Sequence, residues 1–195
     1  MTNAFASQNY AQQLQRLSTD EGLSQNYVVK IQEDEIGFIW IATQQGLNRF
    51  DGYNVETFDG GFELDKHYIS TLLKTQDGKL LVSTDIAGAY LIDPLTLKTE
   101  KIYSGQLDKE KQIYSPVEAM AEKNELYYLA IDNQIVTYNK ITGAFTQTAT
   151  LAEKTSFIRA LTLHNNILFI GANNGLYKFN LVSNQLTEIP LHPAE

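Results

Sequence analysis

The chain has 195 residues, of which 43% are hydrophobic and 19% charged, and 15 Lys and Arg against 23 Asp and Glu give it a formal net charge of −8. This composition predicts a globular protein and excludes a disordered acidic tail or a membrane bundle. The negative charge argues against nucleic acid as the main partner, because such binding depends on neutralising phosphates. The chain has no cysteine, which excludes disulfides, thiolate zinc sites and cysteine nucleophiles.

Residues 1–11 are expected to form an N-terminal tail outside the fold. They include Ala4-Phe5-Ala6, which has the A-x-A form that signal peptidase cuts, although no apolar signal core precedes it. A small-residue terminus gives the same pattern by chance, so it supports export only together with other evidence. Residues 12–18 then alternate, which predicts a short strand ahead of the first repeat.

Residues 26–60 are expected to form four short strands, at about 28–33, 38–43, 47–50 and 54–58. Gly37, Gly46 and the Asp51-Gly52 pair supply the turns between them. The segments are four to six residues long and rich in Val, Ile, Phe and Thr. Such segments favour strands over any helical period.

The same pattern returns at residues 67–104, 113–151 and 156–192. The aligned residues Thr43, Thr84, Ile131 and Ala172 are 41, 47 and 41 residues apart, and the third copy lacks the turn glycines. A period of about 43 residues with four strands is typical of a β-propeller blade. A sandwich or barrel would not repeat its turn residues at this interval. The sequence therefore predicts an all-β fold, with four propeller blades of four antiparallel strands within residues 12–195.

The first unit resembles two-component regulator propellers, the periplasmic sensor regions of bacterial membrane signalling proteins. Residues 22–53 match G-L-S-x-N followed by V-x-x-I-x-x-D-x-x-G-x-I-W-x-x-T-x-x-G-L-x-R-x-D-G almost position for position. The likeness weakens in the later units. Family members often have seven blades, followed by a membrane segment and a histidine kinase or a diguanylate cyclase. The resemblance therefore implies a partial propeller whose native protein is membrane-anchored outside this fragment.

Residues 12–18 are interpreted as a closing strand, because propellers commonly pair one chain end into the blade made by the other. The fourth unit already supplies its own last strand at residues 185–191, which leaves no vacancy. Either further blades follow, or four blades close alone and this strand adds an outer fifth. An open arc would expose faces that favour self-association.

Three signature features have structural interpretations that need no ligand. Asp34 ahead of Gly37 suits a turn whose backbone donors need a carboxylate. Trp40 lies in an apolar strand and is expected to pack between blades. Arg49 and Asp51 are expected to form an ion pair between blades, with ligand contact as the alternative.

No catalytic or metal-binding motif occurs in the sequence. The three histidines are far apart, and no H-E-x-x-H, G-x-S-x-G, Walker or G-x-G-x-x-G pattern exists. We therefore expect no cofactor and no metal. A carboxylate pair assembled from different blades would leave no trace in the spacing.

Propeller topology indicates where a ligand would bind. The connection entering the first strand and the one between the second and third strands emerge at the same edge, here called the rim. The entering residues are Tyr27, Tyr68 and Phe157, with Tyr114 displaced by two residues in the irregular third unit. Aromatic residues at one rim position could stack on a sugar or simply pack at the strand end. Neighbouring polar candidates are His67, Gln44, Gln45, Asp85, Asp132, Asn133, Asn173 and Asn174.

The preferred interpretation is a non-enzymatic, periplasmic sensor module that binds a small molecule or an oligosaccharide. Signalling to a kinase or cyclase is implied by the resemblance alone. The alternatives are a propeller enzyme, such as a lyase or hydrolase, and a protein-interaction scaffold.

Overall fold

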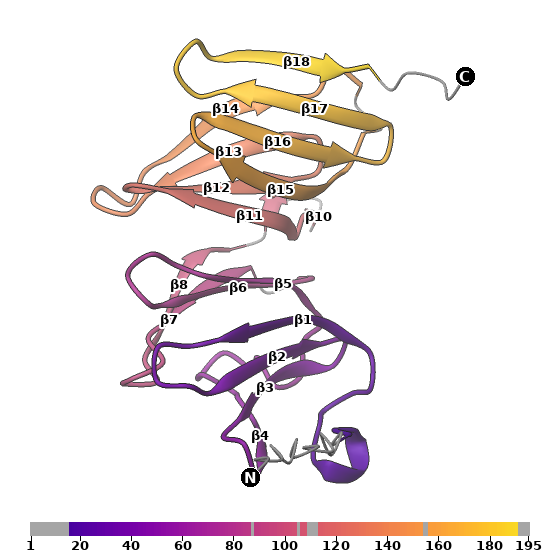
Figure 1. Cartoon of the computed structure of the whole chain (residues 1–195), viewed down its shortest axis with the longest axis vertical. Helices are drawn as coiled ribbons and strands as arrows, with labels where there is room; N and C mark the ends of the chain where they lie inside the picture. Colours follow the sequence, from indigo (N-terminus) through magenta and orange to yellow (C-terminus); the bar gives the residue numbers. More distant parts are fainter. Residues whose placement is uncertain (1–15, 87, 105, 109–112, 154–155, 191–195) are drawn as a thin grey trace, which may run out of the picture.

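The computed structural model describes residues 16–86, 88–104, 106–108, 113–153 and 156–190, with the backbone alone for the strands at 106–108 and 113–114. These residues form four antiparallel sheets of four strands, here called blades 1 to 4, together with a short 3-10 helix, η1 (Thr19–Glu21) (Figure 1). The all-β fold and the four-stranded blades predicted from the sequence are confirmed.

Within each blade the strand order follows the chain, from the innermost strand to the outermost. Blade 1 contains β1 (Val28–Glu33), β2 (Ile39–Thr43), β3 (Gly46–Phe50) and β4 (Val55–Thr57). Blade 2 contains β5 (Ile69–Lys74), β6 (Leu80–Thr84), β7 (Ala89–Ile92) and β8 (Thr99–Tyr103). Blade 3 contains β11 (Val117–Lys123), β12 (Leu126–Ile131), β13 (Gln134–Asn139) and β14 (Phe145–Thr150). Blade 4 contains β15 (Ile158–His164), β16 (Ile167–Ala172), β17 (Gly175–Asn180) and β18 (Gln185–Ile189).

Adjacent blades pack face to face, and each seam between two blades has a hydrophobic core. In the first core Trp40 of blade 1 packs with Tyr90 of blade 2, and both side chains are buried. The cores of the next two seams contain Leu81 with Leu129, and Tyr128 with Phe179. Burial of apolar area between blades is therefore the main source of stability for the stack.

The four blades form an open arc. Their innermost strands pack in chain order, β1 on β5, β5 on β11 and β11 on β15. Blades 1 and 4 lie at opposite ends of the stack (Figure 1). The described residues therefore do not form the closed four-bladed ring that the sequence left open as an alternative, and the chain contains part of a larger propeller.

The turn after β1 is organised by the carboxylate of Asp34, which is 3% exposed. Its Oδ1 accepts hydrogen bonds from the backbone N–H groups of Ile36 and Phe38, each at 3.0 Å. Its Oδ2 accepts one from Trp40 Nε1 at 2.8 Å. The same side chain thus orders the turn and positions the indole in the seam, as the sequence predicts for both residues.

The predicted ion pair between Arg49 and Asp51 is wrong. The Arg49 guanidinium lies over the Phe38 ring, 3.5 Å from its centroid. Asp51 instead accepts hydrogen bonds from the backbone N–H groups of Tyr53 and Asn54. A short carboxylate next to glycine satisfies its own turn more readily than it reaches a distant cation.

Residues 12–15 of the predicted closing strand lie outside the described residues, and residues 16–18 form no strand. Beyond η1, the side chain of Leu23 is buried. The Ser24 N–H donates to Asn48 Oδ1 at 2.9 Å, and Asn48 Nδ2 donates back to Ser24 Oγ at 2.8 Å. This reciprocal pair anchors the G-L-S-x-N segment to blade 1.

Blade 3 begins later than the regular spacing predicts, because a small hairpin precedes it. β9 (Gln106–Asp108) pairs with β10 (Ile113–Tyr114) as a separate sheet. The hairpin accounts for the long spacing between the second and third units. It also explains why Tyr114 is displaced: Pro116 occupies the position directly before β11.

Replacing Asp34 with Ala is expected to lower the free energy of unfolding by about 3 kcal/mol, because three backbone and indole donors lose their acceptor. Urea denaturation measures this change. Asp51→Ala is the matched control, since it also removes a turn carboxylate but leaves donors that water can reach, and its effect should be smaller. Equal losses in the two variants would contradict the role assigned to Asp34.

Candidate functional site

The innermost strands of all four blades border a shared groove. β1, β5, β11 and β15 lie side by side, and the hollow between them has a volume of about 350 Å³. Residues along it include Val29, Lys30, Ser70, Thr71, Glu118, Met120, Arg159 and Leu161. In a complete propeller this surface would line part of the central channel.

Each innermost strand carries a β-bulge at the same place. The register between the first and second strands of the blades shifts at Val29, Ser70, Glu118 and Arg159. A bulge leaves one extra residue unpaired and re-aims its side chain. All four bulge residues border the groove. The bulges therefore contribute one additional side chain per blade to this surface.

Two bulge residues form an ion pair across the seam between blades 3 and 4. Arg159 Nη1 lies 3.0 Å from Glu118 Oε2, and the two side chains are 58% and 28% exposed. The Arg159 guanidinium also lies 5.6 Å from the centre of the Phe157 ring. The pair thus stands beside one of the predicted rim aromatic residues and remains open to solvent.

Sequence reasoning missed Glu118 and Arg159. The sequence feature that could have identified them is their place after the residue that enters the innermost strand. Arg159 lies two residues after Phe157, and Glu118 lies two residues after Pro116. Strand alternation alone does not reveal a bulge, so this regularity becomes visible only once the register is known.

The predicted rim aromatic residues directly precede the innermost strands of blades 1, 2 and 4. A recurrent hydrogen bond joins each of them to the turn between the second and third strands. The donors are the backbone N–H groups of Gln44, Asp85 and Asn173, and the acceptors are the carbonyls of Tyr27, Tyr68 and Phe157, at 3.2, 3.0 and 3.0 Å. The entering residue and this turn therefore lie together at one edge of each of these blades.

The three aromatic side chains differ in accessibility. Tyr27 is 60% exposed and Phe157 is 41% exposed, whereas Tyr68 is half-buried. Burial, followed by the negative charge of Glu118, raises the pKa of Tyr68 above its usual value. Its hydroxyl therefore stays protonated at neutral pH and can donate a hydrogen bond to a ligand.

Several predicted polar rim residues serve the turns themselves. Asn173 Oδ1 accepts from the Phe157 N–H at 2.7 Å, and Asn174 Nδ2 donates to Glu153. Asp132 accepts from Ser115 Oγ at 2.7 Å, while Asn133 donates to the Leu151 carbonyl. The side chains of Gln44 and Gln45 are exposed. Those of His67, which directly precedes Tyr68, and of Asp85 are half-buried.

The groove and rim together offer aromatic faces, the guanidinium of Arg159, the ammonium of Lys30 and the hydroxyl of Thr71, whereas the Ser70 hydroxyl already donates to the Val117 carbonyl at 3.0 Å. This donor set can bind a polar ligand by stacking and hydrogen bonding. Within the described ranges, no three His, Cys, Asp or Glu side chains are arranged to hold a metal ion. The same residues include no helix long and apolar enough to cross a membrane.

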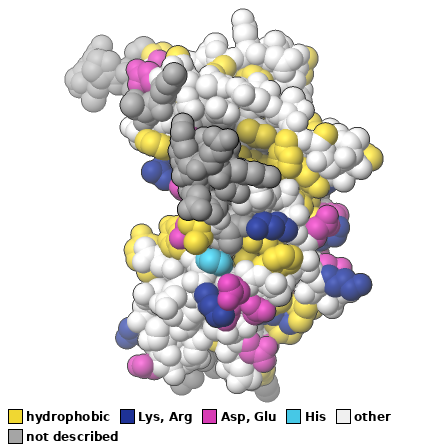
Figure 2. All heavy atoms as spheres, turned by 180° about the vertical axis from the view of Figure 1, so that it is seen from behind, with side chains coloured by type: hydrophobic (Ala, Val, Ile, Leu, Met, Phe, Trp, Pro, Cys, Tyr) yellow, Lys and Arg dark blue, Asp and Glu magenta, His cyan; other side chains and the backbone are white. Residues whose placement is uncertain are grey.

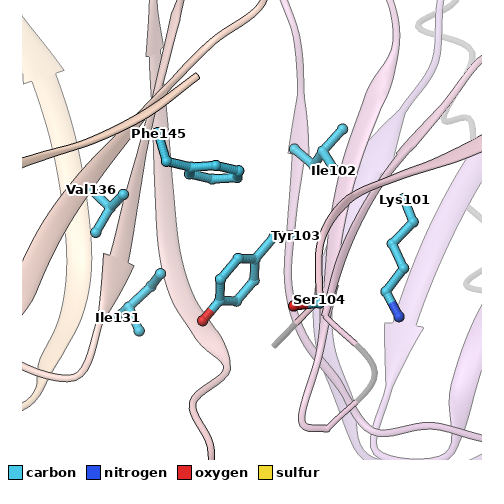
Figure 3. Close-up of a pocket in the computed structure, with 7 residues that line it drawn as sticks. All are labelled: Lys101, Ile102, Tyr103, Ser104, Ile131, Val136 and Phe145. Carbon is cyan, nitrogen blue, oxygen red and sulfur yellow. The ribbon is translucent and has the colours of Figure 1, made fainter. Parts of the chain in front are cut away.

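A larger hollow, of about 580 Å³, lies between blades 2 and 3 on their outer part. Figure 3 shows Phe145, Val136 and Ile131 of blade 3 on one side, and Ile102 and Tyr103 of blade 2 on the other. The Tyr103 and Phe145 rings are 6.0 Å apart. This hollow is mostly apolar, and its lining residue Ile131 directly precedes the predicted rim residues Asp132 and Asn133.

Comparison with known proteins supports the resemblance found in the sequence. Residues 22–45 match the family model described as two component regulator propeller. A stretch of 38 residues is 45% identical to histidine kinase P4 of Formosa agariphila, covering 20% of this chain and 3% of that protein. The predicted resemblance to two-component regulator propellers is confirmed.

Solved structures share the fold. The extracellular domain of a one component system from B. thetaiotaomicron superposes with a TM-score of 0.71 at 22% identity, over 85% of this chain and 22% of that chain. The extracellular domain of a hybrid two component system from the same organism also gives 0.71 at 22% identity, over 92% and 26%. Virginiamycin B lyase from Staphylococcus aureus gives 0.65 at 15% identity, over 85% and 56%. The chain thus spans about a quarter of the two extracellular domains.

Arg159→Ala is expected to lower the free energy of unfolding by less than about 1 kcal/mol, because solvent-exposed ion pairs contribute little. Lys140→Ala is the contrasting variant. Lys140 Nζ lies 2.8 Å from Glu122, whose side chain is 4% exposed, so its removal leaves a buried carboxylate unpaired and should cost about 3 kcal/mol. Thermal and urea unfolding measure both. A large loss for Arg159→Ala would assign the Glu118–Arg159 pair a structural role.

Proposed function

We propose that the chain is part of a ligand-sensing propeller in the periplasmic region of a membrane signalling protein with a histidine kinase output. It binds a small molecule or an oligosaccharide and performs no chemistry on it. The family match at residues 22–45 and the fold shared with extracellular regulator domains support this assignment. Because the chain spans a small part of those proteins, signalling belongs to the whole protein.

One observation carries the proposed location of the ligand. Aromatic residues recur at one rim position in three blades, and next to them the bulges add Glu118 and Arg159 from neighbouring blades. Stacking on flat ligand faces combined with charged hydrogen-bonding groups is a common way to recognise sugars and similar polar molecules. The Glu118–Arg159 pair is exposed, so a ligand can replace one of its partners with little loss of stability.

Signal transmission needs a difference in affinity between two arrangements of the protein. A ligand that contacts several blades at once favours the arrangement in which those blades are correctly spaced. The groove has this property, since its walls come from four blades. The bound state would then shift the balance between two domain or dimer arrangements across the membrane.

A glycan panel titrated against the chain by calorimetry should reveal a ligand whose affinity falls at least tenfold in the double variant Tyr27→Ala/Tyr68→Ala. Arg159→Ala should weaken the same ligand, because a guanidinium is lost from the groove wall. Tyr53→Ala is the control, since this tyrosine is 86% exposed and lies in the turn between β3 and β4, at the edge opposite the rim. Equal affinity in the wild type and the double variant would show that the rim aromatic residues do not bind the ligand.

The proposal also includes self-association through the open ends of the arc. Ile31 in β1 is 59% exposed and Val28 is 39% exposed. Seen from behind, apolar side chains are also exposed on the half formed by blades 3 and 4 (Figure 2). Light scattering at rising concentration should therefore show dimers or larger species, and a clean monomer at high concentration would contradict this part.

A further inference from the structure

A second hollow at the seam between blades 2 and 3 is polar and lies at the opposite end of the strands from the rim. Its volume is about 370 Å³. The residues around it that bear charge are Asp77, Lys79 and Glu100 from blade 2, with Glu125 and Lys140 from blade 3. We call this hollow the seam cleft.

Both lysines of the seam cleft already have partners. Lys79 Nζ lies 3.4 Å from Asp77 Oδ2, and Lys140 Nζ lies 2.8 Å from Glu122 Oε1. Glu100 and Glu125 make no ion pair with any described residue, and they stand on opposite walls. When Glu122 is counted with the lining residues, the seam cleft has four carboxylates, those of Asp77, Glu100, Glu122 and Glu125. It has two ammonium groups, those of Lys79 and Lys140, so two negative charges are uncompensated.

The equivalent seam between blades 1 and 2 contains a lysine that links its two blades, and the seam between blades 2 and 3 has no such lysine at the same position. There Lys74, at the end of β5, reaches Glu35 of blade 1 at 2.8 Å. Glu122 occupies in blade 3 the position that Lys74 occupies in blade 2. Lys74 pairs with Leu80 of the second strand, and Glu122 pairs with Tyr127, which is the residue of blade 3 equivalent to Leu80. Glu122 reaches back to blade 2 by accepting from the Gln76 N–H at 2.6 Å. The second seam has therefore exchanged its bridging cation for a carboxylate.

The deep wall of the seam cleft holds a polar group without a partner. Tyr127 lines the cleft and is 0% exposed, and its hydroxyl has no hydrogen bond of acceptable geometry within the described chain. The nearby Thr75 hydroxyl already donates to Asp77 and accepts from the Lys79 N–H. A buried hydroxyl without a partner is costly and uncommon, so a ligand that displaces the side chains covering it would gain a hydrogen bond there.

The electric field in the cleft favours positive charge. Burial alone lowers the pKa of Lys140, but its hydrogen bond to Glu122 and the negative charges of Glu122, Asp77 and Glu125 outweigh burial and raise it. Burial and the charges of Asp77 and Glu122 raise the pKa of Tyr127, so its hydroxyl remains neutral. The carboxylates contribute to both pKa shifts, although burial is the largest cause of the shift of Tyr127.

We propose that the seam cleft binds a small organic ammonium ion, a primary amine. Its N–H groups donate to the carboxylates of Glu100 and Glu125 and to the hydroxyl oxygen of Tyr127. Its carbon chain packs against Leu91, Ile102 and the ring of Tyr138, which stacks on Tyr127 with centroids 6.2 Å apart. A metal ion fits less well, because the described residues include no group of three ligands arranged for one.

The bound amine replaces the cation that the second seam lacks. It joins a carboxylate of blade 2 to a carboxylate of blade 3 and so ties the two blades together. The site is separate from the groove and rim, and it does not depend on the proposed sensing of a ligand there.

The test uses butylammonium chloride as the probe, with 1-butanol and sodium butyrate as neutral and anionic analogues of the same length. Calorimetry on the chain should detect binding of the ammonium ion alone, and the binding should weaken as salt is added. Glu100→Gln and Glu125→Gln should each reduce the affinity by up to about fivefold. Both side chains are exposed, so these variants should fold normally.

Tyr127→Phe distinguishes a binding role from a structural one. Because the hydroxyl has no partner, its removal should leave the melting temperature of the free protein unchanged or higher, while the affinity for butylammonium falls about tenfold. A lower melting temperature would show that the hydroxyl has a structural partner and would overturn the proposal. Unchanged binding in all three variants, or equal binding of 1-butanol, would also overturn it. Tyr27→Ala is the control and should bind the amine normally.

Discussion

The structure depends on the burial of each blade against its neighbour. A single four-stranded sheet of this length cannot hide its apolar face, and here Trp40, Leu81 and Tyr128 are buried only because the next blade covers them. Order within one blade is therefore coupled to the presence of the next. The same constraint aligns the innermost strands, since blades that pack through equivalent residues bring their first strands to a common axis.

The alignment of the innermost strands determines which side chains line the groove. Because every innermost strand bulges at the same residue, the side chains of Ser70, Glu118 and Arg159 reach one level from three blades. Each bulge falls at the second residue of its strand, next to the rim. Blade packing therefore fixes the positions of the innermost strands, and the bulge residues, which differ from blade to blade, determine the chemical groups in the groove.

The seams are not equivalent. The first is bridged by Lys74 and Glu35, whereas the second carries Glu122 at the matching position and leaves room for the seam cleft. The inserted hairpin lies at this same seam, next to the hollow lined by Tyr103 and Phe145 (Figure 3). The second seam is thus where the repeat departs most from its own pattern, and hollows remain between its blades.

The sequence by itself determined the period, the strands and the roles of Asp34 and Trp40, because turn chemistry and alternation are local properties of the chain. It failed for Arg49, whose cation–π contact with Phe38 depends on how two strands pair. It also did not reveal Glu118 with Arg159, or Tyr127 with Glu100 and Glu125. Glu118 meets Arg159, and Glu100 approaches Tyr127 and Glu125, across seams between blades and from positions far apart in the chain. Tertiary structure alone decided them, because the register of a bulge and the spacing of two blades come from packing.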